Sequence, residues 1–192
     1  MEYKVIIGII AVSVGVISYI PYTKSTIKGI TKPHAFSWLI WSVIAAITFA
    51  AQLSGGAGPG AWISAVATIS CFIIFLMALK KGEKNIVLLD WLSLGGAAIS
   101  LFCWYLTNSP LMTVIIITII DCFGFIPTIR KSYFAPAEEN TSLYALSSLS
   151  YLATLFAMNT YSIITILNPF VMVIANSSFA FLLLWRRKIL KT

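Results

Sequence analysis

The stretch LMTVIIITIIDCFGFIPT at residues 111–128 decides the fold class of this chain. It carries no charge except at Asp121, and its length is close to the roughly 20 residues that cross the hydrocarbon core of a bilayer as a helix. It lacks the regular alternation of polar and apolar residues that a strand of a membrane barrel requires. We therefore interpret it as a transmembrane helix.

Six further stretches have the same character, at residues 5–22, 35–53, 60–79, 86–106, 142–158 and 162–185. The composition agrees, because 59% of the residues are hydrophobic and 10% are charged, against about 25% charged in ordinary soluble domains. The mean hydropathy is +0.94. Little chain remains outside the stretches. We expect an all-α integral membrane protein of seven transmembrane helices, with no soluble domain.

The basic residues lie in alternate connections between these spans. Of the 13 basic residues, all except Lys4 fall after the first, third, fifth and seventh spans. With seven crossings they share one face, and the positive-inside rule puts that face in the cytoplasm. We expect the N-terminus outside, the C-terminus in the cytoplasm, and a location in the cell membrane. The net charge of +7 therefore predicts no nucleic-acid partner.

Two halves of the chain share a register. When the sequence is shifted on itself, Ile20-Pro21 falls on Ile126-Pro127, and Lys80-Lys81 then falls on Arg186-Arg187. The first three spans thus match the last three. Three crossings reverse the chain direction, so one inserted span restores a parallel orientation. We expect a three-helix repeat at residues 1–84, a linker helix at 85–107 and a second repeat at 108–192, a plan known among transporters.

This plan resembles the SWEET and PQ-loop (MtN3-like) superfamily of sugar uniporters, proton-coupled lysosomal amino-acid exporters and related carriers. The stretches Ile20-Pro21-Tyr22-Thr23-Lys24 and Ile126-Pro127-Thr128-Ile129-Arg130 look like the openings of PQ loops. Tyr22 and Thr128 stand where the superfamily has glutamine. The resemblance implies that Pro21 and Pro127 are hinges. Helix termination is the alternative, since each lies within a turn of a predicted loop.

Asp121 is the most informative single residue, because a carboxylate near the bilayer centre costs roughly 2.5–3.5 kcal/mol on insertion scales and so needs a partner. It fits a proton- or cation-coupling group, or a hydrogen-bond acceptor for a substrate. The alternative is a structural tether to a hydroxyl such as that of Ser13 or Ser18. Asp90 lies one turn inside the basic cluster at Lys84, and we expect it to pair there.

Polar residues recur at helical spacing in two repeat-equivalent spans. Ser147, Tyr151, Thr154 and Met158 share one face of the sixth span, and Ser37, Trp41, Thr48 and Gln52 share one face of the second. Since Thr48 and Thr154 are equivalent in the repeat, the two faces could border a shared substrate cavity. Such groups also serve as hydrogen bonds between helices, and this alternative stays open.

The resemblance implies further binding residues. It places an asparagine of the seventh span against the sugar, which corresponds to Asn168, while Asn176 is deeper and could instead bond between helices. It also implies an aromatic pair near the outer ends of the second and sixth spans, at Phe49 and Phe156, where ordinary packing is equally consistent. We assign Trp38 to an aromatic belt at the inner membrane boundary and expect His34 to be a solvated loop residue.

No serine–histidine–acid set, metal-ligand cluster or nucleotide fingerprint occurs in the sequence, so we expect no enzyme activity, cofactor or metal. The predicted function is alternating-access transport of a small polar solute bound at midplane between the repeats. A sugar is favoured, and an amino acid or vitamin stays open. The alternatives are a receptor or sensor of the same fold that binds without transporting, and a proton-coupled amino-acid exporter of the cystinosin type. The expected partners are the solute and the bilayer, and a homo-oligomer stays open.

Overall fold

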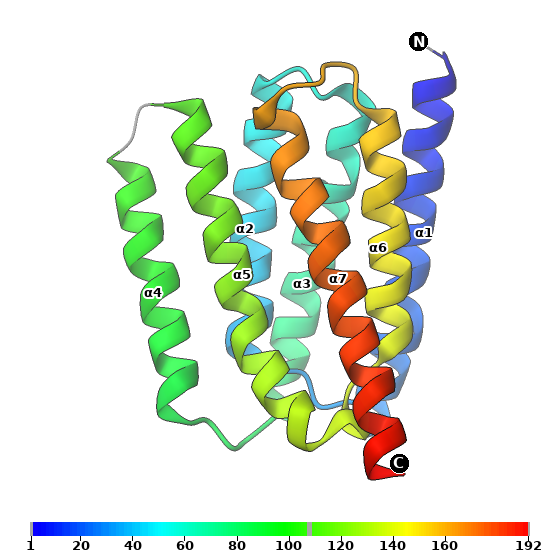
Figure 1. Ribbon diagram of the computed structural model, residues 1–192, viewed down its shortest axis with the longest axis vertical. Helices are drawn as coiled ribbons and strands as arrows, with labels where there is room; N and C mark the ends of the chain where they lie inside the picture. The colour runs from blue at the N-terminus through cyan, green and yellow to red at the C-terminus, as the bar shows by residue number, and fades with distance from the viewer. Residues whose placement is uncertain (1, 107–108, 192) are drawn as a thin grey trace.

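The computed structural model describes residues 2–106 and 109–191, and within them the chain forms only helices. Seven are α-helices and two are short 3-10 helices (Figure 1). In chain order they are α1 (Glu2–Ile27), α2 (Ala35–Ser54), η1 (Gly58–Ala61), α3 (Trp62–Lys81), α4 (Leu88–Tyr105), α5 (Pro110–Phe134), η2 (Pro136–Glu138), α6 (Thr141–Ala157) and α7 (Ile163–Leu190).

Five helical segments of the described chain are long and apolar enough to cross a membrane: Glu2–Ile27, Ala35–Ser54, Gly58–Lys81, Leu111–Phe134 and Ile163–Leu190. The other two predicted spans correspond to α4 and α6, which are 18 and 17 residues long. Large apolar side chains such as Ile6, Ile69 and Phe181 face outward. In water this surface would be unfavourable, whereas lipid solvates it. The long apolar helices and the apolar exterior are those of an all-α integral membrane protein.

Several helices extend past the predicted spans at their basic ends. Pro21 and Pro127 consequently lie inside helices, because α1 continues to Ile27 and α5 to Phe134. The interpretation of these prolines as helix ends is wrong. Basic residues occupy the last turns of α1, α3, α5 and α7, where a positive charge stabilises the carbonyl end of a helix. These turns lie outside the apolar spans, which explains why hydropathy placed the helix ends too early.

The spatial order of the helices differs from their chain order. α1 packs against α6 and α3, α5 packs against α2 and α7, α2 packs against α3, and α6 packs against α7. α4 lies at one edge of the bundle, against α5 and a small part of α2, and α1 lies at the opposite edge (Figure 1). The contacts therefore occur in matching pairs: α1–α6 with α5–α2, α2–α3 with α6–α7, and α1–α3 with α5–α7.

Small residues allow α1 to approach its neighbours closely. Gly8, Ala11, Gly15 and Ser18 recur on one buried face of α1. A Cβ atom at Gly15 would lie 2.2 Å from Ile63 Cδ1, so a larger residue there would force the Ile63 side chain to move. On the same face the Ser150 hydroxyl of α6 donates to the Ala11 carbonyl oxygen at 2.6 Å. Small residues at this spacing bring membrane helices together when no hydrophobic effect does so.

Asp90, at the start of α4, pairs with a different partner from the one expected. Its carboxylate is fully buried and accepts hydrogen bonds from Nε and Nη2 of Arg130, both at 2.9 Å. Lys84, the predicted partner, instead donates to the Leu79 carbonyl oxygen at 3.0 Å. The planar guanidinium bonds the two carboxylate oxygens through two separate nitrogens, a geometry that the single nitrogen of an ammonium group cannot provide. This pair fastens the basic end of α4 to α5.

His34 is also buried here, contrary to the expectation of a solvated loop residue. Its Nε2 atom lies 3.3 Å from Asp90 Oδ2 without the alignment of a hydrogen bond. Burial lowers the pKa of the His34 side chain, and the neighbouring Asp90 carboxylate partly opposes this shift. The residue before α2 is thus packed into the junction between α4 and α5, which is a tertiary contact that sequence position alone does not reveal.

Arg130→Gln should destabilise the protein strongly. The substitution leaves the fully buried Asp90 carboxylate without its charged partner, which costs about 3–5 kcal/mol in comparable buried pairs. Thermal unfolding of the purified protein in detergent measures the effect. Lys80→Gln removes a positive charge from an exposed position near the same end and should leave the melting temperature almost unchanged. Equal melting temperatures for the two variants would contradict this role of the pair.

Candidate functional site

A cavity of about 50 Å³ lies inside the bundle, lined by side chains from α1, α2, α3, α5, α6 and α7. α4 contributes no described residue to it. A cavity of this volume holds about one or two water molecules. Polar side chains are unusually concentrated on its wall for a protein whose exterior is so apolar. They are Asp121, Asn168, Asn176, Thr48, Ser64 and Ser147.

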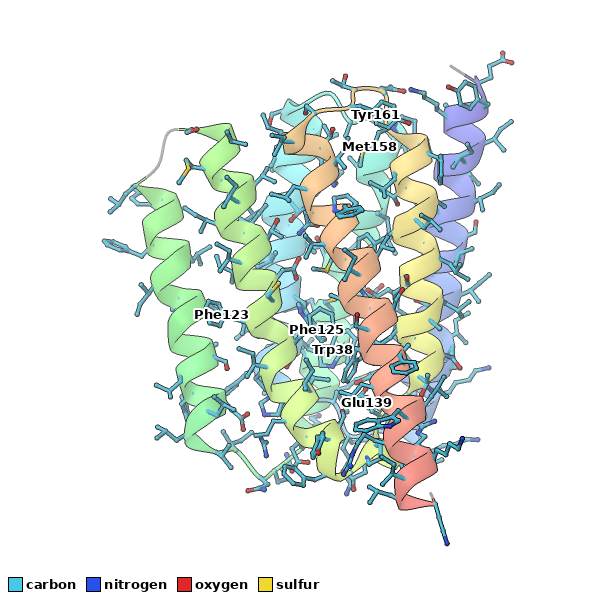
Figure 2. The ribbon with its side chains drawn as sticks, viewed as in Figure 1. Trp38, Phe123, Phe125, Glu139, Met158 and Tyr161 are labelled. Atoms are coloured by element: carbon cyan, nitrogen blue, oxygen red, sulfur yellow. The ribbon has the colours of Figure 1, made fainter. Side chains whose placement is uncertain are left out.

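Aromatic rings form most of the rest of the wall. They belong to Tyr19, Trp38, Trp41, Phe125, Tyr144 and Tyr151. Three of the rings pack edge to face in a row, with ring centres 5.2 Å apart between Trp38 and Trp41 and 4.8 Å apart between Trp41 and Phe125. Figure 2 shows Trp38 and Phe125 in the interior, between Met158 near one end and Glu139 near the other. Trp38 is therefore a buried residue of this row and not a member of a boundary belt.

Asp121 is the acidic group of the cavity. Its Oδ2 atom accepts a hydrogen bond from Asn168 Nδ2 at 2.8 Å, so the tether runs to α7 and not to Ser13 or Ser18 of α1. Ser18 instead donates to the Gly15 carbonyl oxygen. Among the described residues that line the cavity there is no lysine, arginine or histidine. The carboxylate thus has a neutral hydrogen-bond donor beside it and no positive charge.

Thr48 differs from the other polar residues of the wall. Its hydroxyl oxygen is buried and has no hydrogen-bond partner among the described residues. An unsatisfied buried hydroxyl costs about 1–3 kcal/mol, so its presence calls for an explanation. The Asn176 side chain, by contrast, donates to the Met172 carbonyl oxygen of its own helix at 2.8 Å. Ser147 lies 3.4 Å from the Ser18 hydroxyl.

The structure brings together Thr48, Ser147, Tyr151, Asn168 and Asn176 of the predicted binding residues, together with Asp121. Gln52, Phe49, Thr154 and Phe156 do not line the cavity. Gln52 accepts a hydrogen bond from Ser64, and Phe49 packs against Ala57, Ala61 and Met158. The Thr154 hydroxyl donates to the Ser150 carbonyl oxygen, and Phe156 is 59% exposed on the outer surface. The two polar stripes therefore border the cavity along only part of their lengths.

Sequence reasoning missed Tyr19, Phe125 and Tyr144 as cavity residues, and it misassigned Trp38. An aromatic residue in an apolar helix fits lipid, core and cavity equally well, so the sequence carries no signal for these positions. For Trp41 the sequence does carry a signal, because its spacing places it on the same helical face as Ser37 and Thr48. The Trp41 indole nitrogen donates to the Asp121 carbonyl oxygen at 3.3 Å, which joins α2 to α5 beside the cavity.

Separate sets of contacts hold the two ends of the bundle beyond the cavity. At the end with the N-terminus, Met158 is packed between η1 residues and its carbonyl oxygen accepts from Lys4 Nζ at 2.6 Å. At the end with the C-terminus, the Glu139 carboxylate pairs with Lys131 at 2.5 Å and accepts from the Tyr144 hydroxyl at 3.3 Å. Arg187 of α7 donates to the Glu139 carbonyl oxygen, so this end joins α5, α6 and α7.

Gly124→Ala should distort the cavity wall. A Cβ atom at this position would lie 2.5 Å from Trp41 Nε1 and 2.8 Å from Trp41 Cδ1, so the indole has to move. Overpacking of this kind costs about 1–3 kcal/mol. Thermal unfolding and tryptophan fluorescence should both change. Gly95→Ala is the matched control, because no heavy atom lies within 4 Å of its new Cβ. The prediction fails if the two alanine variants behave alike.

No family model, curated protein or solved structure matches this chain.

Proposed function

We propose that this protein is a membrane carrier that moves a small polar solute by alternating access. The observation that carries the proposal is the cavity, whose polar and aromatic wall lies within a bundle of apolar helices. Ionisable and polar groups inside a membrane are costly, and where they occur they mark pathways for substrates or ions. Residues from the first three helices and from the last three contribute to one wall, as expected for a site between two halves.

The proposed architecture is seven crossings arranged as two parallel three-helix repeats, residues 1–84 and 108–192, with α4 as the linker. The matching pairs of helix contacts support this, because a twofold relation that places α1, α2 and α3 on α5, α6 and α7 exchanges each pair with its counterpart. The position of α4 outside the other six helices agrees with a linker. Parallel repeats with a site at their interface are a known plan for secondary transporters.

We place the end that carries Lys32, Lys131 and Arg187 in the cytoplasm and the N-terminus outside the cell membrane, following the positive-inside rule. In alternating access, the contacts at Met158 and those at Glu139 would open in turn. A cavity of about 50 Å³ is too small for a sugar or an amino acid, so the helices have to separate before such a solute enters. Pro21 and Pro127 each remove one backbone hydrogen bond inside a helix and are the proposed hinges for this movement.

Uptake into proteoliposomes tests the carrier function. The purified protein should give saturable uptake from a panel of labelled sugars, amino acids, vitamins and small amines, above that of protein-free liposomes. Thr48→Val removes a cavity hydroxyl that has no partner in the described part of the chain, and it should change the KM for the transported solute. Thr154→Val removes the equivalent hydroxyl of α6, which does not line the cavity, and should leave KM unchanged. Absence of uptake across the panel would count against the proposal.

The proposed role of Asp121 is coupling, and Asp121→Asn tests it. The amide keeps the shape and can still accept the hydrogen bond from Asn168, but it can no longer take up a proton. We expect the variant to lose accumulation driven by a pH gradient, while downhill exchange at saturating solute remains. A variant that still concentrates the solute under a pH gradient would falsify the coupling role. Loss of folding without a specific loss of coupling would indicate a structural tether.

A further inference from the structure

The cavity contains an acidic group, Asp121, for which the described residues supply no counter-charge. Asp121 is 7% exposed, and among the described residues its carboxylate forms no ion pair. The other acidic residues with buried carboxylates, Asp90 and Glu139, each have a basic partner in direct contact. Removing one partner of a buried pair leaves an uncompensated charge that costs several kcal/mol. When its carboxylate is ionised, Asp121 stands in that condition until a proton or a cation in the cavity supplies the positive charge.

The wall that surrounds this carboxylate is suited to a particular kind of cation. The rings of Tyr19, Trp38, Trp41, Phe125, Tyr144 and Tyr151 line the same cavity as Asp121. The face of an aromatic ring attracts a cation, most strongly when both are removed from water, and cages of such rings bind alkylammonium groups. Hydrated metal cations are bound instead by many oxygen ligands, typically six to eight for calcium. Asp121 is the only carboxylate among the described lining residues.

Neutral polar groups beside Asp121 complete the site. Asn168 donates to Oδ2, which orients the carboxylate, and the Thr48 hydroxyl, which has no partner among the described residues, can bond a ligand. Thr48 can accept a hydrogen bond from an ammonium N–H or donate one to a hydroxyl of the ligand. A neutral sugar would also find hydrogen-bond partners here, but it would not balance an ionised Asp121. The charge therefore distinguishes the ligand classes, and the hydrogen bonds do not.

We propose that the ligand of this cavity is a small organic monocation, with its ammonium centre against Asp121 and its carbon groups against the aromatic rings. The proposal deepens the carrier function, on which it rests, by naming the class of solute. At its present volume the cavity holds a chemical group about the size of one or two water molecules. The helices therefore have to separate before a larger cation can enter.

Pairs of ligands that differ only in charge test the proposal on the unmodified protein. Choline is compared with its uncharged all-carbon isostere, in which a tert-butyl group replaces the trimethylammonium head, and propylammonium is compared with propanol. Binding is measured by calorimetry and by the ligand-induced shift in melting temperature, since a ligand that binds the folded state stabilises it by mass action. We expect the charged member of at least one pair to bind at least about tenfold more tightly than its neutral partner. Equal binding within both pairs, or binding of neither member, overturns the proposal.

Variants then locate the charge that selects the cation. Asp121→Asn should lower the affinity for the charged ligand by at least about tenfold while leaving the neutral ligand unaffected. Glu2→Gln makes the same chemical change at an exposed position of α1 and should alter neither affinity. Should the asparagine variant fail to fold, the comparison of charged and neutral ligands on the unmodified protein decides alone.

Transport assays separate this proposal from the carrier function. Selective cation binding without uptake would support the ligand class and overturn the carrier. Saturable uptake of a neutral sugar that is undiminished in Asp121→Asn would support the carrier and overturn the ligand class. Uptake of the charged ligand, competed by other small amines and lost in Asp121→Asn at low concentration, would support both.

Discussion

Polar groups inside this bundle have to find their partners within the bundle, because the apolar exterior of the helices offers none. Ser150 of α6 bonds a backbone carbonyl of α1, Ser64 of α3 bonds Gln52 of α2, and Trp41 of α2 bonds a backbone carbonyl of α5. The buried pair of Asp90 and Arg130 fixes α4 by the same requirement. In lipid, unlike in water, a polar group that loses its partner cannot recover the energy from solvent. These contacts therefore decide which helices are neighbours, while small residues such as Gly15 decide how closely they approach.

The cavity brings two incompletely matched polar groups together in the middle of the bundle. Its wall holds a hydroxyl at Thr48 that has no partner among the described residues and a carboxylate at Asp121 without a counter-charge. Such groups reduce stability, and a protein selected for stability alone would replace them with apolar residues. Their presence beside a row of packed aromatic rings supports the proposal that the cavity binds a solute. In the proposed carrier, the contacts around Met158 and around Glu139 would be the two closures of one pathway.

The candidate site was predictable from the sequence where a polar residue stands out in an apolar helix. Asp121, Asn168, Asn176 and Thr48 are visible on that ground, and all of them line the cavity. Helical spacing was a weaker guide. Gln52 and Thr154 share faces with cavity residues, yet neither lines the cavity: Gln52 bonds Ser64, and Thr154 bonds the Ser150 carbonyl oxygen. Phe156 faces outward, because the end of α6 at which it lies turns this side away from the other helices.

The sequence by itself determined that the chain is an apolar all-helical protein with a few isolated polar groups, because length and hydropathy of a segment suffice to select a helix in lipid. It also marked the basic ends of the helices. Only the tertiary structure decided the partner of each polar group: Arg130 rather than Lys84 for Asp90, and Asn168 rather than a serine for Asp121. The tertiary structure also decided which aromatic residues lie at the surface and which line the cavity; Trp38, for example, is buried. The physical reason is that membrane helices are nearly uniform in hydropathy, so the choice of neighbour depends on close packing and hydrogen bonds between residues far apart in the chain.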